Sequence, residues 1–229
     1  MTAPHGAATG VDVDQEEMAQ TAITRSNLYG FLAAIYRVEP TADLLRQIKH
    51  PQFLEALVNV GVTLEKDFLD APEEQLLSEL AVEYTRLFIG PGKHISPHES
   101  VHTQGHDESL WGRTTVAVKD FIESVSVEFR PDYHGMPDHI SVELELMQKF
   151  TEAEANAWQR GDYAEATMWL QLEQEFINNH LARWVPAFCE QIVGQAEVSF
   201  YREMAMVTKQ LLEMEKKQLE GLVKKHRLH

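Results

Sequence analysis

The sequence is poor in cysteine, in cationic side chains and in long apolar runs. A single cysteine, Cys189, among 229 residues excludes an intrachain disulfide and suits a reducing compartment. Twenty Lys and Arg against 36 Asp and Glu give a net charge of −16, which argues against a nucleic-acid or anionic-membrane partner. No apolar run approaches the ~20 residues that span a bilayer, and residues 1–17 lack the basic and apolar regions of a secretory signal. We therefore expect a cytoplasmic protein without an integral membrane segment.

Motifs that carry catalysis are also scarce. There is no Gly-x-Gly-x-x-Gly and no cysteine pair for zinc. The Gly-Pro-Gly-Lys at 90–93 fails as a phosphate loop because Leu87 stands where that loop needs glycine and His94 where it needs Ser or Thr. Cys189 lies within a helical pattern, which favours a buried structural thiol over a nucleophile. The chain is therefore not predicted to be an enzyme, and no cofactor is predicted.

The residue pattern is helical throughout. Apolar side chains recur at three- and four-residue spacings, and no segment alternates with a period of two for long enough to indicate a sheet. Thr41 and Pro51 mark the starts of two short helices, and the glycines at 90–92 end a longer one. We expect an all-α fold: a single helical-bundle domain with a central hinge or linker.

Boundaries follow from breaks in this pattern. We expect a disordered N-terminal segment over residues 1–15, an all-helical domain over 16–220 and a basic C-terminal tail over 221–229. Linker-like breaks are expected near 90–107 and 130–138, with a helix from about Trp111 to Val125 between them. The longest helical region, 138–220, is expected to be interrupted only at 160–163 and at Pro186.

Two stretches of residues 138–220 carry apolar side chains on more than one face of the expected helix. Two apolar stripes run along residues 138–150, which is typical of a helix packed on both sides in the middle of a bundle. Further on, His180 stands in an apolar seam between Phe176 and Trp184. It is interpreted as a hydrogen-bonded core or interface residue rather than a ligand.

Residues 98–102, His-Glu-Ser-Val-His, match the pattern in which two histidines bind zinc and the glutamate activates a water. The same stretch also reads as a capping box, with Ser96 as N-cap, Pro97 at the first helical position and Glu99 at the third.

The surroundings of the motif favour the structural interpretation. The flanks are polar, Val101 alone is apolar, and Gly105 ends the helix early, whereas a catalytic zinc helix needs an apolar back that holds its ligands rigid. We therefore interpret Glu99 as a helix cap and predict no metal site, and we keep His98 and His102 as the metal-binding alternative.

Asp138 and His139 stand at the start of the longest helical region, directly after Pro137. One interpretation makes Asp138 the N-cap of that helix, and the other places the pair in a binding site. These residues alone leave both open.

Several motifs occur in an order that resembles a known family. The chain carries "EYTRLFIGPG", "PHESV", "MPDHISVELELM", "HLARWVPAF" and "FYREMA", and over residues 20–215 it resembles the TorD/DmsD family of redox enzyme maturation chaperones. Its Tyr/Phe/Trp-x-x-Leu-Phe motif is matched by Tyr84, Leu87 and Phe88. Its Glu-Pro/Tyr-x-Asp-His motif is matched at Asp138 and His139, although Gly135 and Met136 replace its first two residues. The "KHISPHESVH" linker resembles the branch that serves type II dimethyl-sulfoxide-reductase-family enzymes.

The resemblance implies a cytoplasmic chaperone. Such proteins bind the twin-arginine leader and the body of a molybdoenzyme catalytic subunit, assist insertion of its molybdenum cofactor and delay its export. The acidic charge of this chain suits a leader with two arginines followed by an apolar stretch.

The resemblance also implies which residues would contact the leader or client. Leu87, Phe88 and Trp111 would supply a hydrophobic groove, Asp138 would pair bidentately with an arginine, and His139 would orient its neighbours or sense protonation. The set of leader- and client-binding residues further includes Tyr84, Pro97 and Ser100.

Two other functions stay open at this point: a zinc-dependent hydrolase that uses His98, Glu99 and His102, and a helical adaptor without a cofactor role. The residues do not identify the client, and both a monomer and a homodimer are compatible with the sequence, with exchange of helices conceivable at the 130–138 break. No phosphate-binding motif indicates a guanine-nucleotide site.

Overall fold

The computed structural model describes residues 10–59, 61–62, 64–103, 112–125 and 135–226. These residues fold into helices joined by turns, and within them β-pairing is limited to an isolated antiparallel bridge between His98 and His139. In chain order the elements are α1 (Gly10–Arg37), α2 (Ala42–Ile48), α3 (Pro51–Asn59), α4 (Lys66–Asp70), α5 (Glu73–Tyr84), the π-helix η1 (Thr85–Ile89), α6 (Glu99–Thr103), α7 (Arg113–Ser124), α8 (Ile140–Arg160), α9 (Tyr163–Phe176), the π-helix η2 (Ile177–Leu181), α10 (Ala182–Gln195) and α11 (Ser199–His226). The expected all-α fold is confirmed.

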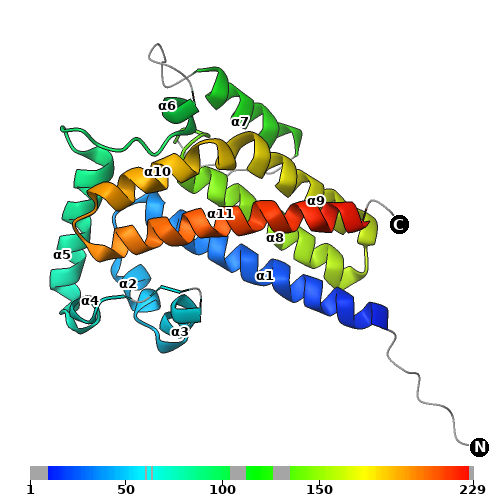
Figure 1. Cartoon of the computed structure of the whole chain (residues 1–229), viewed down its shortest axis with the longest axis horizontal. Helices are drawn as coiled ribbons and strands as arrows, with labels where there is room; N and C mark the ends of the chain where they lie inside the picture. Colours follow the sequence, from blue (N-terminus) through cyan, green and yellow to red (C-terminus); the bar gives the residue numbers. More distant parts are fainter. Residues whose placement is uncertain (1–9, 60, 63, 104–111, 126–134, 227–229) are drawn as a thin grey trace, which may run out of the picture.

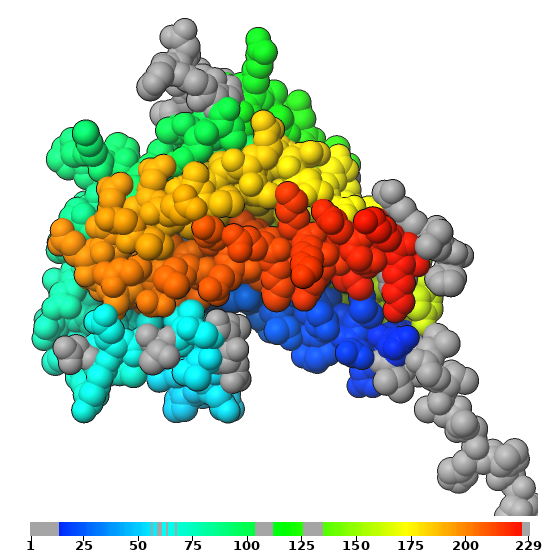
Figure 2. All heavy atoms as spheres, in the orientation of Figure 1, coloured from blue at the N-terminus to red at the C-terminus, as the bar shows by residue number. Residues whose placement is uncertain are grey.

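The long helices α1, α8, α9, α10 and α11 form the body of the bundle (Figure 1), and Figure 2 shows α10 and α11 side by side on its front face. Helix α8 packs extensively against α1 on one side and α9 on the other. Both of its predicted apolar stripes are buried: Ile140, Leu144, Met147, Val142, Leu146 and Phe150. The prediction of a helix packed on two sides is confirmed.

Shorter helices cover the ends of this body. Helices α2 to α5 lie together at one end, while α6 and α7 cover the upper edge in the view of Figure 1. The Thr41 hydroxyl accepts a hydrogen bond from the Leu44 amide and caps α2, and α3 begins at Pro51, both as predicted.

Two breaks were expected in the long C-terminal helical region. The one at 160–163 is present, and the other lies elsewhere. Gly161 ends α8 with φ of 71°, a left-handed conformation that glycine adopts without steric cost. Pro186 does not interrupt the chain: it lies inside α10, where it cannot donate the backbone hydrogen bond that other residues of a helix interior donate. The break instead falls between α10 and α11, at residues 196–198.

Two other boundaries differ from those expected. Helix α1 begins at Gly10, so residues 10–15 are helical, and α11 continues to His226, so most of the expected basic tail belongs to this helix. Helix α7 covers 113–124 of the expected 111–125. Residues 104–111 and 126–134, which include parts of both expected linkers, lie outside the described residues.

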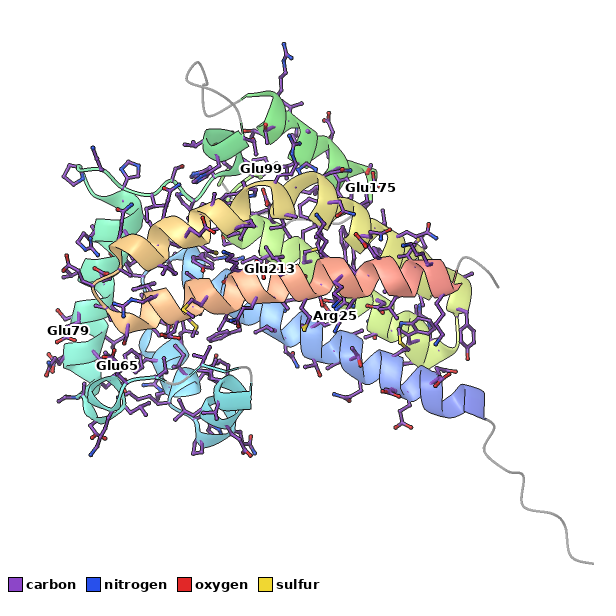
Figure 3. The ribbon with its side chains drawn as sticks, viewed as in Figure 1. Arg25, Glu65, Glu79, Glu99, Glu175 and Glu213 are labelled. Atoms are coloured by element: carbon purple, nitrogen blue, oxygen red, sulfur yellow. The ribbon has the colours of Figure 1, made fainter. Side chains whose placement is uncertain are left out.

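A buried ion cluster ties four helices of the bundle together (Figure 3 shows Arg25 in the gap between α1 and α11). Arg25 on α1 donates to both carboxylate oxygens of Glu215 on α11 through Nε, at 2.8 and 2.9 Å. It also donates to Glu154 on α8 at 2.7 Å and to Glu173 on α9. Burial raises the pKa of the Glu154 and Glu173 carboxyls, and the nearby Arg25 guanidinium opposes this rise.

Within the described part of the chain, no helix is both long and apolar enough to cross a membrane.

Candidate functional site

The two predicted linkers meet on the surface of the bundle. Backbone hydrogen bonds join the Ile140 amide to the Pro97 carbonyl and the Glu99 amide to the Asp138 carbonyl, each at 2.9 Å. The Ile95 amide donates to the Leu87 carbonyl at 2.7 Å and so anchors the same segment to the end of η1. The tertiary structure therefore brings together four of the predicted site residues, Pro97, Ser100, Asp138 and His139.

Asp138 is fully buried and caps a helix other than the expected one. Its Oδ2 accepts the amide N–H of Ser100 at 3.1 Å, so its carboxylate and its carbonyl together hold the start of α6. Helix α8 is instead capped by His139, whose Nδ1 accepts the Ser141 amide at 3.1 Å. Of the two interpretations, the one that makes Asp138 the N-cap of α8 does not hold, because the Ser100 amide takes its carboxylate.

The expected pairing of Asp138 with a leader arginine is not available in this arrangement. The Asp138 side chain is inaccessible to solvent, and its Oδ1 has no hydrogen-bond partner among the described residues. A guanidinium would reach it only if α6 moved away. In this conformation Asp138 contributes to the molecular surface only indirectly, by holding α6 in its position.

His139 is held neutral. Burial, followed by the nearby His98 and Arg37, lowers the pKa of His139 to about 3. Since Nδ1 accepts a hydrogen bond from Ser141, the proton of the neutral ring sits on Nε2. This burial favours the role of orienting its neighbours over that of sensing protonation near neutral pH.

Glu99 lies at the centre of a second buried cluster, below α6 (Figure 3). Its Oε2 is 2.9 Å from Nδ1 of His180 in η2. Its carboxyl group also lies within hydrogen-bonding reach of Glu143 on α8, which accepts the indole N–H of Trp184 at 3.0 Å. His180 is thus the hydrogen-bonded core residue that the sequence predicts.

This cluster holds α6 on the bundle. Burial, then the proximity of Glu99 and Asp138, raises the pKa of the Glu143 carboxyl well above its usual range. The Glu99 and Glu143 carboxyls each keep one buried oxygen, Oε1, without a hydrogen-bond partner among the described residues. Burial therefore favours the protonated form of Glu143 in this cluster.

The His-Glu-Ser-Val-His stretch therefore has a structural role that differs from the predicted one. Ser96 does not cap α6, because its Oγ lies 3.3 Å from Nδ1 of His98 and the helix starts at Glu99. Glu99 is buried against His180, so it cannot serve as a solvent-facing base. The side chains of its two histidines diverge.

The divergence is clear from their contacts. The His98 ring packs edge-on against His139, with ring centres 5.0 Å apart. His102 bonds to the Ser96 carbonyl at 2.7 Å and stacks on Trp184 with ring centres 5.2 Å apart. Among residues 10–103, 112–125 and 135–226, as far as they are described, no group of three or more potential metal ligands is assembled.

The Tyr84, Leu87 and Phe88 motif lies in the core rather than along an open groove. All three side chains are buried, and the Tyr84 hydroxyl donates to the Tyr36 carbonyl at 3.0 Å. Phe88 packs against the rings of Tyr36, Tyr84, Phe188 and Tyr201. Leu87 and Phe88 do not line an open groove in this conformation, because both side chains are packed in the core. Trp111, the third expected groove residue, lies outside the described residues.

Two residues beside this motif were missed by the sequence reasoning. Glu83 is almost fully buried and its Oε1 accepts the amide of Glu197 at 2.7 Å, just before α11. Arg86 pairs with Glu83 and donates to the Gln195 carbonyl at 2.7 Å. Although burial alone raises the pKa of Glu83, its hydrogen bonds from Arg86 and the backbone lower it overall. The pair clamps the turn between α10 and α11, and its i,i+3 spacing is the only local signal of it.

Comparison with known proteins agrees with the motif order. The family model described as "Nitrate reductase delta subunit" matches residues 50–190, more than half of the chain. A "Chaperone protein TorD" from Psychrobacter sp. is 23% identical over 80% of this chain and 86% of its own length. A "Probable Tat proofreading chaperone DmsD" from Haemophilus influenzae is 22% identical over 82% of this chain and 89% of its own length.

A solved structure is also similar. It comes from Archaeoglobus fulgidus, and its name places it among redox enzyme maturation proteins. It is 20% identical, covers 82% of this chain and 93% of its own, and superposes with a TM-score of 0.48. On the match of the family model, this chain belongs to the nitrate reductase delta subunit family, that is, the TorD/DmsD family of redox enzyme maturation chaperones.

Proposed function

We propose that this chain is a cytoplasmic, non-enzymatic chaperone for the catalytic subunit of a molybdopterin-dependent oxidoreductase. It would bind the subunit's twin-arginine leader and its body, assist insertion of the molybdenum cofactor and delay export until the subunit is mature. Family membership over residues 50–190 is the observation that carries the proposal. The linker resemblance points to a type II dimethyl-sulfoxide-reductase-family enzyme as the client.

The charge and the site chemistry support a binding role. A net charge of −16 favours a leader that carries arginines. The most polar buried clusters, around Arg25 and around Glu99, are engaged in packing helices together. The fit of Glu99 against His180 also removes the catalytic base that the zinc-hydrolase alternative requires.

The predicted site residues would act on the client through α6. Asp138 and Ser100 fix the start of this helix, and Pro97 and His139 fix the segments on either side of it. Val101 on α6 and Val116 on α7, against which α6 packs, are both about half exposed. This face would contact the body of the client by its exposed apolar side chains, with Tyr84, Leu87 and Phe88 supporting it from the core.

Co-purification tests the proposal. The tagged full-length chain is expressed in its native host, isolated by its tag, and the bound proteins are identified by mass spectrometry. We expect a molybdopterin oxidoreductase subunit with a twin-arginine leader, and we expect its recovery to fall when the leader is deleted from the subunit. Recovery of no such subunit, or only of proteins unrelated to redox enzymes, contradicts the proposal.

A further inference from the structure

A cavity lies away from α6, at the end of the bundle opposite α2 to α5 (Figure 1). It has a volume of about 1020 Å³ and is formed by the N-terminal part of α1, the start of α9 and the end of α11. Figure 1 shows these ends of α1 and α11 at the same end of the molecule. We refer to this cavity as the α1/α9 groove.

Most of the lining area of the α1/α9 groove is apolar, although polar side chains also line it. The apolar residues include Met18 on α1, Tyr163 and Met168 on α9, and Trp158 from the last turn of α8. Met168 and Tyr163 are 44% and 41% exposed, so the groove is open to solvent along α9. Methionines in such a surface adapt to apolar side chains of different shapes.

Hydrogen bonds of Gln15 fix the end of the α1/α9 groove that lies beside the turn between α8 and α9. The Gln15 side chain donates to the Trp158 carbonyl at 2.6 Å and accepts from the Tyr163 hydroxyl at 3.1 Å, which ties α1 to the turn between α8 and α9. The Trp158 indole donates to Glu154 of the Arg25 ion cluster at 2.8 Å. The groove is therefore pre-formed, and an occupant would not have to order its walls.

The rim of the α1/α9 groove is acidic at its α1 side. Asp14 and Glu17 are exposed there, and Lys225 is the cation among the residues that line it. On a chain of net charge −16, this arrangement repels nucleic acid and anionic lipid and attracts a cationic segment.

We propose that the α1/α9 groove binds the leader of the client, with the leader's apolar segment against Met168 and Tyr163 and its arginines beside Asp14 and Glu17. The proposal rests on the proposed function and assigns the leader a surface that is separate from the α6 face. The volume exceeds what a small metabolite fills and suits several apolar side chains of a peptide. The groove also offers apolar walls for the leader's apolar segment and carboxylates for its arginines.

One pair of variants tests the apolar contact. Met168→Gln keeps the length of the side chain but makes it polar, and Met206→Gln is the matched control, since Met206 is 38% exposed on α11 and does not line the groove. Fluorescence anisotropy is measured with a labelled synthetic leader of the co-purified subunit. We expect about tenfold weaker binding for Met168→Gln, or about 1.4 kcal/mol, and a change of less than about twofold for Met206→Gln.

A second pair tests the charged rim. Asp14→Asn with Glu17→Gln removes two charges from the groove. Glu65→Gln with Glu79→Gln removes two exposed charges at the opposite end of the molecule (Figure 3). We expect the first double variant to associate more slowly and to lose most of the salt dependence of association, and the second to behave like the wild type.

The outcomes separate the two proposals. If the wild type binds the leader and all four variants bind it equally well, the groove assignment is overturned and the proposed function stands. If the wild type binds no leader, both proposals fail. If the wild type is a dimer by light scattering and Met168→Gln is a monomer, the groove is occupied by a second copy of the chain, which also overturns the leader assignment.

Discussion

Replacement of Glu99 is the sharpest test of how α6 is held on the bundle. Glu99→Ala removes the acceptor of His180 and leaves the Glu143 carboxyl without its neighbour, all in a fully buried site. Removing one member of such a buried pair costs roughly 3–5 kcal/mol. At about 2–4 °C per kcal/mol for a chain of this size, we expect the melting temperature to fall by about 6–20 °C.

Glu99→Gln should behave differently. Its amide oxygen can accept from His180, and its NH₂ group can donate to the Glu143 oxygen that has no partner among the described residues. The variant can therefore form hydrogen bonds to both His180 and Glu143. We expect its stability at neutral pH to stay within about 1 kcal/mol of the wild type or to exceed it.

The pH dependence of stability distinguishes the ionisation of Glu143 from simple packing. The raised pKa of Glu143 means that its contribution to stability is fully present below its unfolded pKa, near 4.5, and is lost as the pH rises through the folded value. Proximity to Glu99 is one cause of that rise, so Glu99→Gln should lose less stability than the wild type between pH 5 and pH 8.

Thermal unfolding by circular dichroism between pH 5 and pH 8 measures both effects. Glu175→Gln serves as the control, because Glu175 is an exposed glutamate on α9 (Figure 3). The reasoning is refuted if Glu99→Gln destabilises as much as Glu99→Ala, or if its melting temperature falls more steeply with pH than that of the wild type.

Three further predictions follow from the buried groups. Asp138→Ala should cost about 1 kcal/mol by loss of the α6 cap and should speed amide hydrogen exchange in residues 99–103, and unchanged exchange there would rule out this role. Arg25→Met should cost roughly 3–5 kcal/mol in urea unfolding at pH 8 and less at pH 5, where protonation relieves the remaining carboxylates, and equal losses at both pH values would contradict the charge argument. The control Arg46→Met changes an exposed ion pair and should leave the stability nearly unchanged. Burial raises the pKa of the Cys189 thiol to about 12, so a disulfide reagent should modify it only after unfolding, and rapid labelling of the native protein would disprove its burial.

Local sequence determined the helices and many of their ends. The two stripes of α8, the cap at Thr41 and the left-handed Gly161 depend on residues within about four positions of one another, which is the range of helix periodicity and capping. The burial of His180 was predictable for the same reason, since it stands at helical spacing between aromatic residues.

The roles of the candidate site residues were decided only by the tertiary structure. Glu99 meets a partner 81 positions away in His180, and Asp138 caps a helix that begins 39 positions before it in the chain. Local pattern placed Glu99 in a capping box and left the role of Asp138 open, because their partners become visible only when α6 is placed against η2 and the start of α8. Phe88 lies in the core for a similar reason: it packs against Tyr36, Phe188 and Tyr201, which are all distant from it in the chain.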